Sequence, residues 1–137
     1  MDDENFMDIV ERIREKCLAR EEKICGALNL TATEYRGLLC FDDKERITCQ
    51  EFSVRMGLSV SRGSRVIDRL VGKEYVERAD LSSDRRCKNI WLTKKGTAIR
   101  RRIDEQRQRC EKNLTSNYSK TKIERLKKEL NDLVRKF

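Results

Sequence analysis

The sequence predicts a mostly α-helical protein, and three observations lead to this fold class. The chain has 137 residues with no Pro and only 6 Gly, and it is rich in Arg, Lys, Glu and Leu, which are good helix formers. Apolar residues recur at spacings of three, four or seven, as they do along one face of a helix. Three Thr-x-x-Glu sequences also match the capping box that starts a helix. They are Thr31–Glu34, Thr48–Glu51 and Thr121–Glu124.

Four helices are predicted in the first part of the chain. The first covers residues 4–28 and carries an apolar stripe opposite a charged face. The second covers residues 31–41 and ends at a polar turn. The third covers residues 48–56, and a Gly-Leu link joins it to a fourth over residues 59–74. Ser59 can cap this fourth helix. The apolar positions expected on it are Val60, Val66, Ile67, Leu70 and Val71.

The pattern then changes to two short strands, predicted at residues 75–78 and 88–92. The segment between them is polar and typical of a turn. A two-stranded hairpin directly after two linked helices is the arrangement of a winged helix-turn-helix. Two further helices complete the chain, at residues 94–117, where Thr93 can act as the cap, and at residues 121–136.

The long helices at the two ends are interpreted as a dimerisation layer. The apolar stripe of the last helix lies where no later element of the chain can cover it, and the hydrophobic content of 37% is low for a monomer of this length. We therefore expect a homodimer. Its helical dimerisation region would comprise residues 1–28 and 97–137, and the winged helix-turn-helix lobe would comprise residues 29–96.

Charge points to a polyanionic partner. The net charge of +8 and the isoelectric point near 9.3 suit double-stranded DNA first, although a solvated basic surface would give the same values. No apolar run approaches the ~20 residues that a membrane span needs. The acidic start of the chain lacks the apolar core of a signal peptide. We expect a cytoplasmic protein without a membrane partner.

The residue inventory argues against an enzyme. The chain has no His, no Gly-rich loop of the kind that cradles phosphate, and no recognisable pair of catalytic carboxylates. We expect no cofactor and no bound metal. A metal site would have to use Cys and carboxylates alone.

The six Cys residues allow three interpretations, because none of them forms a Cys-x-x-Cys pair. Buried thiols that act as small apolar residues are favoured. A thiol-based redox sensor is the second interpretation, with Cys17, Cys25 and Cys87 as its candidate residues. An iron–sulfur or Cys-only zinc site is the third.

Several short motifs occur in order from Leu30 to about Ile103. Leu30-Thr31 opens the series, and a helix pattern follows from Thr48 to Ser59. The later motifs are Arg65-Val66-Ile67-Asp68-Arg69-Leu70, an Asp-x-x-x-Asp-Arg-Arg sequence at Asp80–Arg86, and Leu92-Thr93-Lys94-Lys95-Gly96. Together these motifs resemble the MarR family of bacterial and archaeal transcriptional regulators over a bit more than half of the chain.

The sequence departs from the family pattern at two positions. Glu74 stands where the family usually has a Gly that ends the recognition helix in a left-handed turn, and Gly72 lies two residues earlier. Gly63 occupies the start of the recognition helix, where it would let the helix approach another backbone closely at a cost of ~1 kcal/mol in helix stability.

The resemblance implies that the fourth helix enters the major groove of DNA and that the wing reaches the minor groove. Arg62 and Arg65 would hydrogen-bond guanine, and Arg85 or Arg86 would form the tip of the wing, with Asp84 fixing the loop. The full set of expected DNA contacts is Ser59, Ser61, Arg62, Ser64, Arg65, Arg69, Asp84, Arg85, Arg86, Lys88, Lys94 and Lys95.

The resemblance further implies a repressor that binds a palindromic operator as a dimer. Its release would come from a small-molecule effector bound between the dimerisation layer and the DNA-binding lobe. Two alternatives stay open: a thiol- or iron–sulfur-based redox-sensing regulator, and a winged-helix module that binds protein. The basic wing argues against the protein-binding module, because protein interfaces are depleted in Lys.

Overall fold

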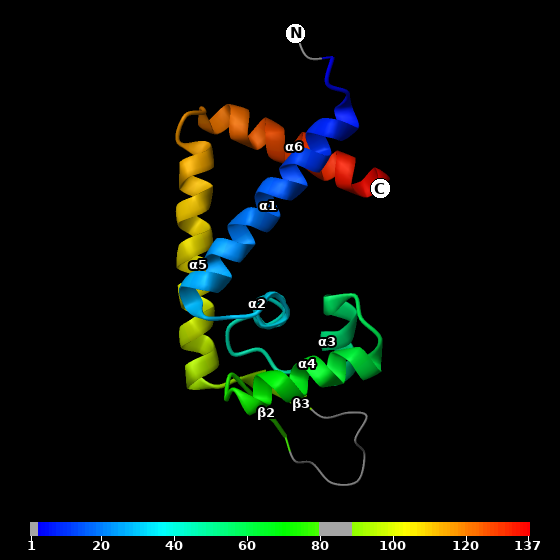
Figure 1. Ribbon diagram of the computed structural model, residues 1–137, viewed down its shortest axis with the longest axis vertical. Helices are drawn as coiled ribbons and strands as arrows, with labels where there is room; N and C mark the ends of the chain where they lie inside the picture. The colour runs from blue at the N-terminus through cyan, green and yellow to red at the C-terminus, as the bar shows by residue number, and fades with distance from the viewer. Residues whose placement is uncertain (1–2, 80–88) are drawn as a thin grey trace. The chain divides into compact units, whose positions relative to one another are not determined.

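The computed structural model describes residues 3–79 and 89–137, and it confirms a mostly helical fold with a small antiparallel sheet (Figure 1). The elements follow the predicted order, with one additional strand. They are α1 (Phe6–Leu28), α2 (Ala32–Leu38), β1 (Ile47–Thr48), α3 (Cys49–Met56), α4 (Val60–Gly72), β2 (Val76–Arg78), β3 (Asn89–Leu92), α5 (Lys94–Thr115) and α6 (Lys120–Lys136).

Helices α3 and α4 form the helix-turn-helix. Gly57 ends α3 in the left-handed conformation, with φ of 68°, which glycine adopts without a steric penalty. The two helices then cross closely at Gly63. A Cβ atom at this position would lie 1.9 Å from Oγ and 3.2 Å from Cα of Ser53. The predicted close approach at Gly63 is confirmed, and the residue that it approaches is Ser53 of α3, chiefly through its side chain.

The sheet has the strand order β1-β3-β2, and both pairings are antiparallel. Strand β1 was not predicted from the sequence. Its two residues pair with β3, with Ile47 opposite Ile90 and Thr48 opposite Asn89. The central strand β3 therefore ties the segment before α3 to the wing.

The hydrophobic core lies among α2, α3, α4, the sheet and the ends of α1 and α5 that face them. Phe41 and Phe52 are fully buried, with ring centroids 5.5 Å apart. The remaining buried apolar residues are Ile24, Cys25, Leu28, Leu30, Tyr35, Leu38, Ile47, Val66, Ile67, Leu70, Val76, Ile90, Ile99 and Ile103.

Hydroxyl side chains start several helices where the sequence predicts them. Thr31 accepts a hydrogen bond from the amide of Glu34, and Thr48 accepts one from Glu51. Ser59 and Thr93 cap α4 and α5 in the same way. Each oxygen satisfies an amide that has no partner within its helix.

The third predicted capping box is wrong, because Ser119 and not Thr121 caps α6. The Ser119 hydroxyl accepts from the amide of Lys122, and the helix already begins at Lys120. Thr121 therefore lies inside the first turn. The complete capping box is at Asn5 and Asp8, where each side chain accepts from the other residue's backbone amide.

Helix α4 ends in a Schellman motif, although the residue in the left-handed conformation is not glycine. Glu74 has φ of 64°. The amide of Tyr75 donates to the carbonyl of Leu70, and the amide of Glu74 donates to Val71. This is the usual hydrogen-bond pattern of a glycine-ended helix. The chain thus makes a turn that glycine usually makes, with a non-glycine residue in the left-handed region.

Arg100 joins α5 to the end of α2. Its guanidinium donates to the backbone carbonyl of Leu38 at 3.0 Å and also to that of Phe41. The same side chain pairs with Asp104, with Nε 3.1 Å from Oδ1. The Leu38 carbonyl lies in the last turn of α2, where no amide of the same helix reaches it, and the Phe41 carbonyl lies in the loop that follows.

The chain divides into two compact units, one ending at Asp104 and the other spanning Glu105–Phe137. In the first unit, α1 leaves Phe6, Ile9 and Ile13 exposed. In the second unit, α6 leaves Leu130, Val134 and Phe137 exposed. The stripes predicted from the sequence are present, and much of each is open to solvent in the single chain. Across the described residues, the structure contains no helix with both the length and the apolar character needed to span a bilayer.

Candidate nucleic-acid interface

Helix α4 is strongly two-sided, and its buried side fixes which residues face outward. Gly63, Val66, Ile67 and Leu70 are buried against the rest of the lobe. With 3.6 residues per turn, Ser61 and Arg65 lie almost opposite this buried side, and both are exposed.

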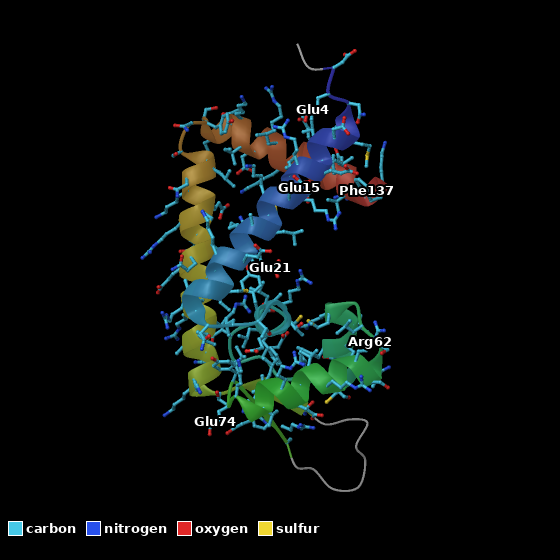
Figure 2. All side chains as sticks on the ribbon, in the orientation of Figure 1. Glu4, Glu15, Glu21, Arg62, Glu74 and Phe137 are labelled. Carbon is cyan, nitrogen blue, oxygen red and sulfur yellow. The ribbon has the colours of Figure 1, made fainter. Side chains whose placement is uncertain are left out.

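The remaining predicted residues of α4 lie at the edges of this outward face. Arg62 and Arg69 are exposed along one edge, and Ser64 is half-buried along the other. Figure 2 shows Arg62 near the start of α4, with Glu74 just beyond the other end. The hydroxyl of Ser59 accepts a hydrogen bond from the amide of Arg62 at 3.2 Å, so the observed role of Ser59 is to cap α4.

Val60 is a correction to the sequence interpretation. It was predicted to belong to the apolar side of α4, but its side chain is 54% exposed. As the first residue of the helix, it projects beyond the part of α4 that packs on α3 and α2. An apolar residue therefore stands on the same exposed surface as the serines and arginines.

The arginines of this surface are electrostatically available. Within residues 3–79 and 89–137, no ion pair involves Arg62, Arg65 or Arg69. By contrast, Arg78 on β2 pairs with Asp68 on α4. This ion pair joins α4 to the sheet, while the three α4 arginines keep their guanidinium groups open to an anionic partner.

The start of α5 adds cations next to the end of α4. Lys94 and Lys95 are both exposed. Thr93 brings them there, because its hydroxyl donates to the carbonyl of Glu74 at 2.6 Å. Nζ of Lys95 lies 5.2 Å from the ring centroid of Tyr75 and 4.0 Å from a carboxylate oxygen of Glu74.

An open hollow of about 1010 Å³ lies between these elements and the sheet. Its walls combine apolar side chains with three cations, Arg78, Lys94 and Lys95, and two acids, Glu74 and Glu77. The structure therefore brings both predicted lysines of α5 to the rim of one concave surface beside α4.

The outer side of the sheet carries a residue that sequence reasoning missed. The guanidinium carbon of Arg46 lies 4.2 Å from the ring centroid of Trp91. The indole Nε1 of Trp91 donates to Glu77 at 3.1 Å. Arg46 precedes β1, and only the pairing of β1 with β3 places it over the wing. No pattern local to Arg46 in the sequence signals that position.

The predicted tip of the wing lies outside the described residues. This applies to Asp84, Arg85, Arg86 and Lys88, and also to the candidate redox residue Cys87. The base of the wing is described, with Glu77 of β2 paired to Trp91 of β3.

The cysteines differ in exposure. Cys25 is buried, and burial raises the pKa of its thiol, with the nearby Glu21 acting in the same direction. Burial also raises the pKa of Cys40, whose Sγ lies 3.3 Å from the carbonyl oxygen of Arg36. Cys17 is exposed, contrary to the expectation of a buried thiol on the α1 stripe. Among residues 3–79 and 89–137, no three Cys, Asp or Glu side chains are grouped so that they could hold a metal ion.

Comparison with known sequences gives one family and a curated relative. A sequence model of the MarR family matches residues 30–88. The transcriptional repressor MprA of Escherichia coli strain K12 is 28% identical over 116 residues, which cover 83% of this chain. The chain spans 66% of the length of MprA. A second MprA sequence, from Escherichia coli O157:H7, matches equally well.

Solved structures share the whole fold. A MarR family protein from Bacillus stearothermophilus has a TM-score of 0.81 at 23% identity, with 95% of this chain and 91% of that chain covered. Wild-type MarR from Escherichia coli in its apo form has a TM-score of 0.73 at 22% identity, with 96% and 98% covered. At these identities the likeness is one of fold.

Proposed function

We propose that this chain is a MarR-family regulator that controls transcription by binding double-stranded DNA in a sequence-specific manner, because the family's sequence model matches residues 30–88 and the repressor MprA is 28% identical to it. The observation that carries the proposal is the outward face of α4, where Arg62, Arg65 and Arg69 are exposed without an ion pair inside the described chain. A basic helix held on a compact lobe is the part of a helix-turn-helix that enters the major groove.

The chemistry of α4 suits the edges of base pairs and the backbone beside them. Arg62 and Arg65 can each give two parallel hydrogen bonds to O6 and N7 of guanine, which is worth ~1–3 kcal/mol of discrimination. The hydroxyls of Ser61 and Ser64 suit phosphate oxygens, which position the helix without reading sequence. Arg69 lies farther along the same edge as Arg62 and would reach the flanking backbone.

Phosphate contacts outside α4 would come from the hollow and the wing. Lys94 and Lys95 stand at the start of α5, where exposed ammonium groups can neutralise a phosphate strand. For the tip of the wing, we propose that Arg85 or Arg86 enters the minor groove, where the negative potential is deep. Asp84 would hold the loop, and Lys88 would contact the backbone.

A homodimer would place two such helices on one operator. Helices α1 and α6 each leave several large apolar side chains exposed, and exposed apolar surface of this kind is typical of an interface when it is contiguous. A two-fold pairing of residues 1–28 and 97–137 would cover them and hold two lobes of residues 29–96. Recognition helices ~34 Å apart would then read a palindromic site.

We further propose that the regulator is a cytoplasmic repressor released by a small-molecule effector. The curated relative MprA is named a transcriptional repressor, which supports this direction of control. An effector bound between the dimerisation layer and the DNA-binding lobe would act by changing the separation of the two lobes.

The test is selection of bound DNA from a random duplex library at fixed salt, followed by titration of the selected site by fluorescence anisotropy. We expect a palindromic sequence and an affinity that falls steeply as salt rises, because phosphate contacts release counterions. Light scattering of the same sample should give the mass of a dimer. A lack of enrichment, or binding that salt does not weaken, would favour a protein-binding module.

A further inference from the structure

Val60 stands out as an apolar side chain placed where packing does not require it. It is the first residue of α4 and is 54% exposed. On the buried side of the helix, Gly63 packs against Ser53 of α3 and Ile67 is only 1% exposed. The side chain of Val60 therefore adds little to the core and projects into the solvent in front of the helix.

The surroundings of Val60 are otherwise polar. One turn later on the same edge of α4 lies the half-buried Ser64. Ser61 and Arg65 occupy the outermost positions of the helix. The exposed start of α4 thus presents hydroxyls, guanidinium groups and one branched apolar side chain.

Each of these groups has a distinct complement in the major groove. Hydroxyl and guanidinium groups match the hydrogen-bonding edges of bases and the phosphates, whereas the 5-methyl group of thymine is the apolar feature that the groove presents. Residues at the start of a recognition helix are the ones that reach base edges. The positive charge of the flanking arginines would hold this end of the helix against DNA.

We propose that Val60 is a specificity-determining residue that contacts the 5-methyl group of a thymine, once in each half-site. This inference rests on the proposed function, since it assigns a base to one residue of the same interface. Loss of a single methyl contact should weaken binding about fourfold, from the usual value for burying one methyl-sized group.

The experiment replaces thymine by deoxyuridine, which lacks only the 5-methyl group, one position at a time in the selected operator. For the natural chain, we expect one symmetry-related pair of positions at which the replacement lowers affinity about fourfold per half-site. For Val60→Ala, the same replacement should change affinity less than about twofold. Cytosine and 5-methylcytosine at that position distinguish recognition of the methyl group from recognition of the thymine base.

Val54→Ala is the matched control, because Val54 is also an exposed valine, at 75%, but lies on α3. This variant should keep the deoxyuridine profile of the natural chain. Circular dichroism checks that each variant is folded. A profile without a sensitive thymine, or the same sensitivity in Val60→Ala, would overturn the inference while leaving the proposed function intact. Failure of the selection to enrich any DNA sequence would contradict both the inference and the proposed function.

Discussion

Both carboxylate oxygens of Glu34 accept hydrogen bonds from Nζ of Lys73, at 2.8 and 2.6 Å, and Glu34 is only 1% exposed. The pair joins the start of α2 to the residue that ends α4. The sequence suggested that Glu34 would reach back to the amide of Thr31 in a capping box. In the structure the Thr31 hydroxyl does accept from the amide of Glu34. The Glu34 carboxylate binds Lys73 and so connects α2 to the end of α4.

Loss of Lys73 should destabilise the fold more than neutralisation of Glu34. Lys73→Ala leaves a buried carboxylate without its partner, and we expect a loss of about 2 kcal/mol, below the value for a fully buried pair because the Lys73 side chain is 43% exposed. Glu34→Gln retains a hydrogen-bond acceptor and should cost about 1 kcal/mol. Urea denaturation followed by circular dichroism measures both. Equal losses would contradict this account of the pair.

Gly63→Ala should destabilise the lobe although alanine favours helix. The added methyl group would meet Oγ of Ser53 at 1.9 Å and its Cβ at 2.8 Å, so α3 and α4 must separate, at a cost of about 2 kcal/mol or more. The matched control is Gly72→Ala on the same helix, which has nothing within 4 Å and should be neutral or slightly stabilising. The midpoint of thermal denaturation should fall for Gly63→Ala and stay level or rise slightly for Gly72→Ala, and a stabilised Gly63→Ala would disprove the tight crossing.

Glu74→Gly should stabilise the protein by about 1 kcal/mol. Glu74 has a left-handed backbone, which costs a non-glycine residue roughly that amount. Its side chain is 81% exposed, and its one ion pair within the described residues is a 4.0 Å contact with Lys95, so its removal loses little. The midpoint of thermal denaturation should rise. Gly57→Ala, at the equivalent position after α3 with φ of 68°, should lower it.

Mutations in α4 and mutations at the start of α5 should affect DNA binding in different ways. Arg62→Ala and Arg65→Ala should each relax the base preference of the selected site, because each would remove a proposed contact to guanine. Lys94→Ala should weaken all sequences alike and lower the slope of log affinity against log salt by about one. Unchanged base preference in both arginine variants would show that another element reads the sequence.

The thiols should react with an alkylating reagent in the order of their exposure. Cys17 is exposed. Burial raises the pKa of Cys25, so a smaller fraction of this thiol is ionised at a given pH. Mass mapping at pH 8 should find Cys17 labelled well before Cys25. The raised pKa also contributes stability below the ordinary thiol value of 9.0, and that stability should fall as the pH rises above it. Labelling of Cys25 first would indicate local opening of α1.

Much of the fold could be predicted because its signals are local. The apolar spacing of α4 and the hydroxyls at Ser59 and Thr93 lie within a few residues of the helices that they specify. The missed features depend on distant partners. Strand β1 has two residues and exists through its pairing with β3, and Glu34 is 39 positions from Lys73. Local sequence patterns do not predict which distant residues will pair.

The candidate site shows the same division. Exposure of Arg62 and Arg65 follows from helical periodicity, so the sequence placed both correctly on the outward face. Val60 was misplaced because periodicity gives a direction around the helix but not where the neighbouring helix ends. Ser119 was missed because both Ser119 and Thr121 are good caps, and the local sequence does not rank them.

The crossing at Gly63 also has a kinetic and thermodynamic meaning for recognition. The close packing of Gly63 on Ser53 restricts sliding and tilting between α3 and α4, so in the proposed function the lobe would present α4 in much the same orientation before and after DNA binds. Binding of DNA would then cost the lobe little conformational entropy, which would favour a higher affinity. If the proposed dimer forms, a signal that releases DNA would act more readily on the distance between its two lobes than on the packing inside either lobe.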